Sequence, residues 1–361
     1  MEKRKYQSPV AVHPGDLIKE WLAENGMTSK EFSLRTGKPE KTISHILNGK
    51  SAIIKDVADR FEIVTGIPSD YILRFQAKYD ADVARLAKKS SMERLWDNFG
   101  DLFPYNELVK KGWVERFTKE ADKMRALLSF FALTSEEAFE EAYATYGVAY
   151  RRTGKASRSP YAVASWLRRG QILANKMAGT PHSPSKSKIE EQIPKFKEAL
   201  KDGSLEELKS LCMNIGIKLV FVENLPKASI SGATYSYGGS RVIQLSGKGK
   251  TLDKLTYNFF HELGHVYHDH KGILVDDIEE SVESEDEQMA DSFAHEAIYA
   301  DIKQFTNKPT LSEVREEARR VGLAPCVVLG HLTHVGLVGY TESNSHYKPL
   351  QQNIEINFDT M

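Results

Sequence analysis

The sequence has very little cysteine. Of its 361 residues only Cys212 and Cys326 are cysteines, and neither has the Cys-x-x-Cys partner of a zinc ribbon. A disulfide framework is therefore excluded, and two isolated thiols are typical of a protein from a reducing cytosol. We expect both to be buried structural side chains.

Long apolar runs and an excess of one charge are also missing. The charged start is not followed by an apolar segment, and nowhere do about 18 apolar residues occur consecutively. We therefore predict a cytoplasmic protein with no membrane partner. With 49 Lys and Arg against 50 Asp and Glu, the composition by itself does not indicate nucleic acid.

The chain is long enough for two or three domains, and its pattern changes along its length. It begins with short helical patterns punctuated by glycine, continues with a region rich in helix formers, and acquires strand patterns after residue 204. We predict a mostly helical α+β protein. Its expected segments are residues 8–80, 81–205 and 206–361.

The first segment has the layout of a helix-turn-helix. Thr28 followed by Glu31 is a capping box that opens the second helix, Gly37 supplies a turn, and Pro39 suits the first position of the third helix. The predicted helices cover residues 15–25, 29–36, 39–47, 53–65 and 68–79.

The last segment contains two predicted strands, at residues 217–222 and 242–245. They are separated by a Gly- and Ser-rich connection. A helix follows, opened by Thr251, and this helix carries the most informative motif of the chain.

That motif is His261-Glu262-Leu263-Gly264-His265. Residues four apart on a helix lie on the same face, so His261 and His265 can both present a ring nitrogen to one ion at about 2.1 Å. Histidines also occur in helices without ligating anything, and the motif can arise by chance. Phe259, Phe260 and other apolar neighbours bury this helix, however, so its polar groups need strong partners, and a Zn2+ ion is the simplest.

Glu262 is not required as a ligand. Beside a zinc ion it can take a proton from a water molecule whose pKa the metal has lowered to near 7, and the resulting nucleophile attacks a peptide carbonyl. This arrangement predicts a metallopeptidase with Glu262 as general base.

A hydrolytic zinc site needs a third protein ligand and one open position. His268 is seven residues from His261, a rise of about 10 Å, which is too far for one helix to supply all three ligands. Glu287 opens a second helical pattern in which small alanines permit close packing, and we predict it as the third ligand. Asp291, one turn on, either fixes the tautomer of a ligand histidine or lies at the surface.

The paired motifs Phe259-Phe260-His261-Glu262-Leu263-Gly264-His265 and Glu287-Gln288-Met289-Ala290-Asp291-Ser292-Phe293-Ala294 resemble the ImmA/IrrE family of zinc metallopeptidases. The similarity extends to Ser231-Gly232-Ala233 and to Trp166-Leu167-Arg168-Arg169-Gly170. It implies zinc ligands His261, His265 and Glu287, the base Glu262, and a partner transcriptional repressor as the protein substrate.

The resemblance also carries expectations for the rest of this segment. The strand at residues 242–246 would lie at the sheet edge beside the zinc helix, where an extended peptide could add as one more strand, and polar Gln244 and Ser246 permit an exposed face. The closing helices depart from the family at His331, where arginine is usual. His334 could assist at the oxyanion, although a histidine on a packed helix is more often structural.

The first segment resembles the XRE-type helix-turn-helix of HigA-like antitoxins, through His13-Pro14-Gly15 and Ile43-Ser44-His45-Ile46-Leu47-Asn48-Gly49-Lys50. In that fold the third helix enters the major groove of operator DNA, and such domains often act as homodimers. Lys38 and Lys50 would meet phosphates. The other expected contacts are Glu40, Lys41, Thr42, Ser44 and His45.

Two features leave the DNA prediction open. The first 80 residues are only weakly basic, so a helical domain that binds protein is an alternative. Pro39-Glu40 also places a proline and a carboxylate where small polar residues are common.

Three functions remain possible at this point. The favoured one is a zinc-dependent endopeptidase and transcriptional regulator that cleaves a repressor. The alternatives are a non-catalytic DNA-binding repressor or HigA-like antitoxin with a structural or vestigial metal site, and a protein-binding module that senses metal. Glu262 discriminates among them, because neither alternative requires a base between the ligands.

Overall fold

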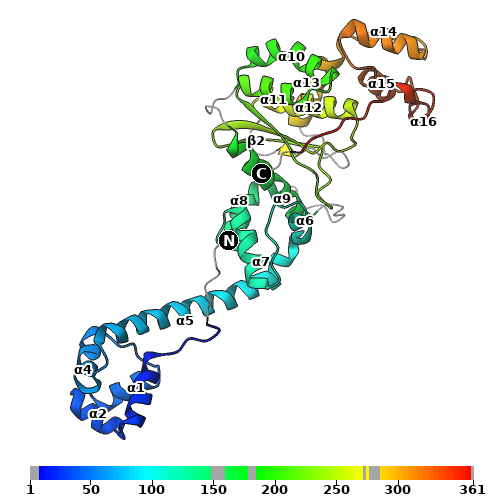
Figure 1. Ribbon diagram of the computed structural model, residues 1–361. Helices are drawn as coiled ribbons and strands as arrows, with labels where there is room; N and C mark the ends of the chain where they lie inside the picture. The colour runs from blue at the N-terminus through cyan, green and yellow to red at the C-terminus, as the bar shows by residue number, and fades with distance from the viewer. Residues whose placement is uncertain (1–7, 148–158, 178–183, 271–273, 276–284, 359–361) are drawn as a thin grey trace. The chain divides into compact units, whose positions relative to one another are not determined.

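The computed structural model describes residues 8–147, 159–177, 184–270, 274–275 and 285–358 (Figure 1). The chain forms two compact units, one made of residues 1–98 and 117–125 and the other of the remainder. The predicted boundary at residue 80 lies inside a long helix, and the division into three segments stays a prediction. No helix among the described residues is long and apolar enough to cross a membrane.

Five helices cover residues 14–98 of the first unit: α1 (Pro14–Glu24), α2 (Ser29–Thr36), α3 (Glu40–Leu47), α4 (Lys55–Thr65) and α5 (Ser69–Asn98). The five predicted helices are confirmed, but the last continues well beyond residue 79. Neither glycine nor proline occurs between residues 69 and 98, so nothing in this stretch interrupts helical hydrogen bonding.

The start of α2 and the turn to α3 follow the predicted pattern with two corrections. Thr28 Oγ1 accepts a hydrogen bond from the backbone N–H of Glu31, but the Glu31 carboxylate accepts from Arg35 (2.6 Å), so the predicted capping box is only half formed. Gly37 adopts a left-handed φ of 63° that ends α2. Pro39 is the residue before α3 and not its first helical residue, since its ψ of 140° is still extended.

The core of this unit forms where α1 meets α3. His13 caps α1 by accepting a hydrogen bond from the Gly15 N–H, and a Cβ on Gly15 would lie 2.2 Å from the carbonyl oxygen of Ile46. Glycine at residue 15 therefore permits this helix contact. The buried apolar residues around it are Ile18, Leu22, Phe32, Ile43, Ile46, Leu47, Ile53, Val57, Ala58, Phe61 and Ile72.

The next elements are mainly helical. They are η1 (Gly100–Leu102), α6 (Tyr105–Lys110), α7 (Glu120–Phe131), α8 (Glu136–Gly147), α9 (Pro160–Lys176), α10 (Lys186–Lys201) and α11 (Leu205–Asn214). The first residues of α7 belong to the first unit and the others to the second.

A small sheet forms the centre of the second unit. Its strands are β1 (Ile217–Phe221), β2 (Gly232–Tyr237), β3 (Ser240–Leu245) and β4, described at Leu274–Val275. The strand order is β1-β3-β2-β4, with β1 parallel to β3 and β2 antiparallel to both of its neighbours. The sequence missed β2, which lies inside the predicted Gly- and Ser-rich connection.

The prediction that residues 242–246 form an edge strand is wrong. β3 lies between β1 and β2, and Gln244 is fully buried. Its side-chain amide is satisfied inside the protein, because Nε2 donates to the carbonyl of Trp166 (2.8 Å) and Oε1 accepts from the hydroxyl of Tyr235 (2.7 Å). A polar side chain with internal partners does not require solvent.

Further helices complete the unit: α12 (Leu252–Tyr267), α13 (Glu285–Tyr299), α14 (Leu311–Val321), α15 (Pro325–His334), α16 (Tyr340–Ser343) and η2 (Lys348–Leu350). Of these, α12 packs on the sheet. The apolar residues of α12, including Phe259, Phe260 and Leu263, belong to one core with β1 and β3. This mostly helical α+β architecture confirms the predicted fold class.

Candidate metal centre

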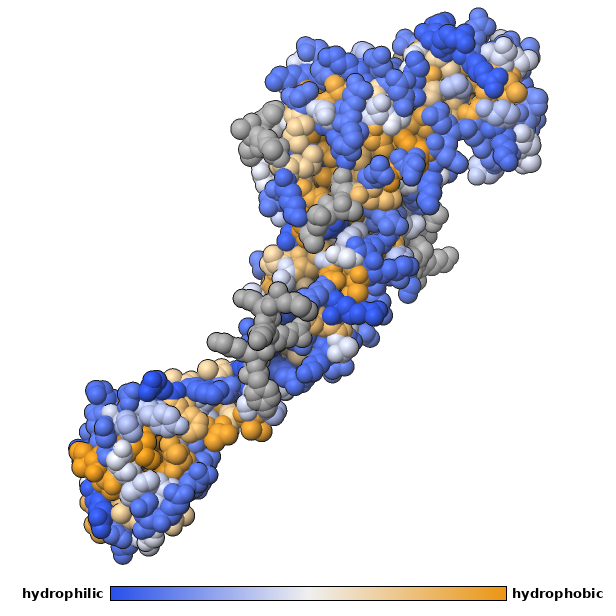
Figure 2. All heavy atoms as spheres, viewed as in Figure 1, coloured by the Kyte–Doolittle hydropathy of each residue, from blue (hydrophilic) through white to orange (hydrophobic). Residues whose placement is uncertain are grey.

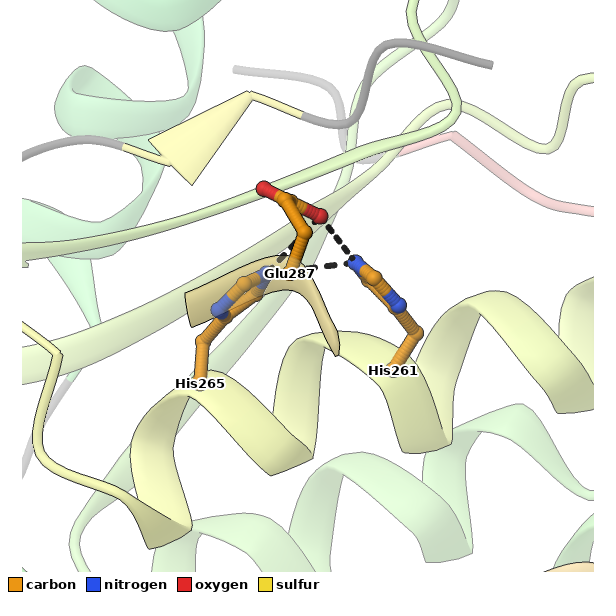
Figure 3. Close-up of side chains that lie close together, drawn as sticks. All are labelled: His261, His265 and Glu287. Atoms are coloured by element: carbon orange, nitrogen blue, oxygen red, sulfur yellow. Dashed lines mark hydrogen bonds and ion pairs between the residues drawn. The ribbon is translucent and has the colours of Figure 1, made fainter. Parts of the chain in front are cut away.

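The two histidines of the motif converge on one point. His261 and His265 lie one turn apart on α12, both are buried, and their Nε2 atoms are 3.1 Å apart. Glu287, from α13, brings Oε2 to 3.1 Å from Nε2 of His261 and to 3.7 Å from Nε2 of His265 (Figure 3). The structure therefore brings the three predicted ligands together.

The donor set fits a zinc ion. Two imidazole nitrogens and one carboxylate oxygen are the ligands of many catalytic zinc sites, and they leave a fourth position for water or substrate. Among the described residues this is the one group of three such side chains whose donor atoms all lie within 4.8 Å of one another. The other ring nitrogen of each histidine has a protein partner, which leaves Nε2 to ligate.

The ionisation of the site also suits a cation. Burial lowers the pKa of His265, which favours the neutral imidazole. Burial opposes ionisation of Glu287, but its hydrogen bonds with His261 and His265 outweigh this and hold its pKa at about 2. Neutral imidazole and ionised carboxylate are the forms that bind metal.

Asp291 lies behind His261, as predicted for a carboxylate that fixes a tautomer. Its Oδ1 is 2.8 Å from Nδ1 of His261 and also accepts a hydrogen bond of 2.6 Å from the hydroxyl of Tyr257. With a proton on Nδ1, the lone pair of His261 Nε2 points toward the site. The structure shows this contact with a ligand histidine, but the Asp291 side chain is also 52% exposed, so the alternative of a surface carboxylate holds as well.

Glu262 is held by β2. Its carboxylate is buried, and its Oε2 accepts a hydrogen bond of 2.6 Å from Oγ1 of Thr234. A Cβ on Gly232 would lie 2.3 Å from Glu262 Oε1, so this position needs glycine for the carboxylate to approach the strand. Sequence reasoning did not assign roles to Thr234 or Gly232, because it missed β2, although Gly232 lies in one of the family-like motifs.

A close helix crossing sets the distance between the ligands on α12 and the ligand on α13. At Gly264 a Cβ would lie 2.9 Å from both Cα and the carbonyl oxygen of Ala290. Only small residues permit this approach, and Ala290 is the next helical turn after Glu287. The pair of Gly264 and Ala290 therefore determines where the Glu287 carboxylate lies.

The histidines of α15 lie against other aromatic rings. His331 stacks on Tyr299 with ring centroids 4.6 Å apart, and His334 lies 5.2 Å from His295 by the same measure. His295 in turn contacts Tyr257, the partner of Asp291. An oxyanion role for His334 stays a prediction.

The predicted recognition helix α3 presents two kinds of side chain. Ile43, Ile46 and Leu47 are buried, as expected, and Glu40, Lys41 and, beyond the helix, Lys50 are exposed. The partly exposed residues of α3 are Thr42, Ser44 and His45.

Lys38 differs from a lysine that extends freely into solvent. Its ammonium forms an ion pair with Asp56 of α4, and this bond, with one from Arg60, lowers the pKa of the Asp56 carboxyl. A phosphate would have to compete with Asp56 for Lys38.

The first unit also exposes several apolar side chains, and Figure 2 shows apolar patches on its surface. Ile63 and Leu34 are the most exposed, at 84% and 77%. The others in this unit are Val10, Val12, Ile54, Tyr71 and Val83. Contiguous exposed apolar patches are more typical of protein contacts than of DNA contacts, so the alternative of a helical domain that binds protein stays open.

Comparisons with known families agree with both resemblances. Residues 224–353 match the family model described as Peptidase U49, an ImmA/IrrE-type family, and residues 18–72 match the model described as Helix-turn-helix. The first match includes β2, α12 and α13, and the second includes α2 and α3. The chain thus combines a region similar to helix-turn-helix domains with a region similar to a peptidase family.

Solved structures similar to this chain include two antidote proteins. One is an addiction module antidote protein of the HigA family from Coxiella burnetii, 25% identical, covering 23% of this chain and 92% of that one, with a TM-score of 0.22. The other, from Nostoc punctiforme, is described as an antidote of a plasmid maintenance system and is 28% identical, covering 23% and 91%, with a TM-score of 0.23. No curated protein matches the chain.

Proposed function

We propose that the chain is a zinc-dependent endopeptidase and transcriptional regulator that cleaves a partner transcriptional repressor. The observation that carries this proposal is the convergence of His261, His265 and Glu287 beside the buried carboxylate of Glu262. A structural zinc site is normally closed by four protein ligands and needs no base, whereas three donors leave one position open for water and Glu262 supplies the base.

The residues of the site have distinct roles in this proposal. His261, His265 and Glu287 would hold Zn2+, which supplies a Lewis acid for the peptide carbonyl and lowers the pKa of water to near 7. The Glu262 carboxylate takes up the proton of the attacking water and returns it to the amine nitrogen of the leaving peptide. Thr234 orients this carboxylate through the hydrogen bond to Oε2.

The first unit would bring the enzyme to operator DNA. In this proposal Glu40, Lys41, Thr42, Ser44 and His45 face the major groove, and Lys38 and Lys50 meet phosphates. Residues 8–80 would be the DNA-binding domain, residues 81–205 a helical linking region and residues 206–361 the peptidase domain, and two copies would read paired half-sites.

The test combines metal analysis with a cleavage assay. We would measure zinc per chain by elemental analysis, then incubate the protein with the repressor encoded beside its gene. Glu262→Gln should retain zinc and lose cleavage, whereas Glu296→Gln, a matched change of an exposed residue on α13, should cleave like the native protein. Equal cleavage by Glu262→Gln, or no zinc under replete conditions, would refute the peptidase proposal.

Zinc binding with no effect of Glu262→Gln on any function would instead favour the non-catalytic repressor or antitoxin. DNA binding is tested separately, by a gel shift against the DNA upstream of the gene.

A further inference from the structure

The contacts behind His265 differ from those behind His261. His261 has a carboxylate partner, but Nδ1 of His265 lies 3.0 Å from Nδ1 of a second imidazole, His270. Both rings are buried. Two neutral ring nitrogens at this distance can share only one proton, so the tautomers of the two histidines depend on each other.

The direction of this hydrogen bond follows from the position of the other donors. Nε2 of His265 faces Nε2 of His261 and the carboxylate of Glu287, so Nε2 is the atom that would ligate. A neutral imidazole that ligates through Nε2 carries its proton on Nδ1. His265 Nδ1–H therefore donates, Nδ1 of His270 accepts, and His270 carries its own proton on Nε2.

A carboxylate lies close to Nε2 of His270, the nitrogen that carries this proton. Oδ1 of Asp286 lies 3.3 Å from Nε2 of His270. Within the described part of the chain, this buried nitrogen has no hydrogen bond of good geometry, so Asp286 is the acceptor that the structure offers it. Asp286 directly precedes Glu287 on α13, so the helix that supplies the third ligand also supplies this carboxylate.

The backbone of His270 is anchored independently of its ring. The Arg241 guanidinium of β3 donates through Nη2 to the carbonyl oxygens of His265 (3.4 Å) and His270 (3.0 Å). These two hydrogen bonds hold the turn after α12 against the sheet and place the ring of His270 next to that of His265.

We propose that His270 is a positioning residue for the metal site. Its Nδ1 accepts a hydrogen bond from His265 Nδ1–H, and its own Nε2–H faces the carboxylate of Asp286. These two contacts orient the His265 ring for ligation. The site then has two supporting chains, His261 to Asp291 and His265 through His270 to Asp286. α13 supplies the terminal carboxylate of both, together with Glu287. The inference rests on the proposed zinc site and concerns affinity for the metal, not the cleavage reaction.

The first experiment measures the affinity of the full-length protein for zinc by competition with a chromophoric chelator. His270→Leu removes the acceptor and should weaken zinc binding roughly 10- to 100-fold, as loss of an outer-shell partner does. His270→Asn keeps an acceptor where Nδ1 lies and should restore most of the affinity. His346→Leu, which removes an exposed imidazole outside this group, should bind zinc like the native protein.

The second experiment reads the tautomers directly in the native protein, and so does not depend on variants that fold. In the zinc-loaded protein with 15N-labelled histidine, the ring nitrogen shifts should show a protonated Nδ1 on His265 and an unprotonated Nδ1 on His270. The reverse assignment would overturn the inference.

The outcomes separate this inference from the function on which it rests. Zinc binding by the native protein together with native affinity in His270→Leu would overturn the positioning role and leave the peptidase proposal standing. Failure of the native protein to bind zinc would overturn both.

Discussion

Replacing Gly264 with alanine should widen the metal site without changing any of the ligand residues. The added Cβ would lie 2.9 Å from Cα of Ala290, whereas carbon atoms in contact prefer about 3.5 to 4.0 Å, so α12 and α13 must separate by roughly 0.6 to 1.1 Å. Ligand distances in zinc sites are held within about 0.2 Å, and Glu287 moves with Ala290. The displacement therefore exceeds what the site tolerates.

The effect on stability should be smaller than the effect on zinc. Forcing a methyl group into a packed contact costs about 1 to 3 kcal/mol, and alanine in place of a helical glycine returns about 0.5 to 1 kcal/mol. The net destabilisation of the metal-free protein is then between about 0 and 2.5 kcal/mol. We expect zinc affinity to fall at least roughly 10-fold, the lower end of the effect of outer-shell changes.

Zinc affinity is measured by competition with a chelator, and stability by urea unfolding of the metal-free protein. The unfolding transition that moves to higher urea when zinc is added belongs to the unit with the metal site, and this transition is the one to compare. Gly330→Ala is the matched control. Gly330 also lies in a helix, α15, but its Cβ would meet Asp253 at an ordinary 3.5 Å, so this variant should gain stability and keep native zinc affinity. Native zinc affinity in Gly264→Ala would refute the role assigned to the helix crossing.

Three other predictions follow from named contacts. Thr234→Val removes a hydrogen bond to the charged Glu262 carboxylate, worth about 1.5 to 3 kcal/mol, so cleavage should slow roughly 10- to 100-fold while zinc affinity stays unchanged. Thr234→Ser keeps the hydroxyl and should restore the cleavage rate, and equal rates for the two variants would contradict this role of Thr234. Burial first, and then neighbouring histidines, lower the pKa values of His295 and His331 below 6.5, so the unfolded chain binds protons before the folded one does. The free energy of unfolding should therefore be highest above pH 6.5 and fall as the pH drops below it. This fall should be less steep in the double variant His295→Gln, His331→Gln than in His346→Gln, a control at an exposed site. Identical pH profiles for the two variants would count against the assignment. Lys41→Ala should weaken DNA binding in the gel shift and reduce the slope of log affinity against log salt concentration by about 1. Lys88→Ala, at an exposed position of α5, should change neither. Equal effects of the two variants would argue against α3 as the recognition helix.

Local sequence patterns were enough for the helices and for the ligand motif. The five helices of the first unit begin near the predicted residues because caps and glycine turns act over three or four residues. The end of α5 was missed because a run without breakers does not show where a helix stops. The strand β2 was missed although a local signal was present: it pairs with β3 across Gly238-Gly239, a two-residue hairpin turn in which both φ values are positive. The glycine and serine residues of this stretch favoured the interpretation as a connection.

The edge-strand error has a different origin. Gln244 looked compatible with solvent, but its amide meets a carbonyl of α9 that is 78 residues away along the chain. Whether a polar side chain is buried depends on such partners, and these are supplied by packing.

The sequence by itself determined that two imidazoles and a carboxylate lie on one turn of a helix, since the helical period is a local property. It also indicated Glu287, whose helix has a recognisable apolar pattern. Only the tertiary structure decided that Asp291 lies behind His261, His270 behind His265, and Thr234 beside Glu262. These pairs join separate elements, and their distances depend on contacts such as Gly264 against Ala290, which no spacing along the chain encodes.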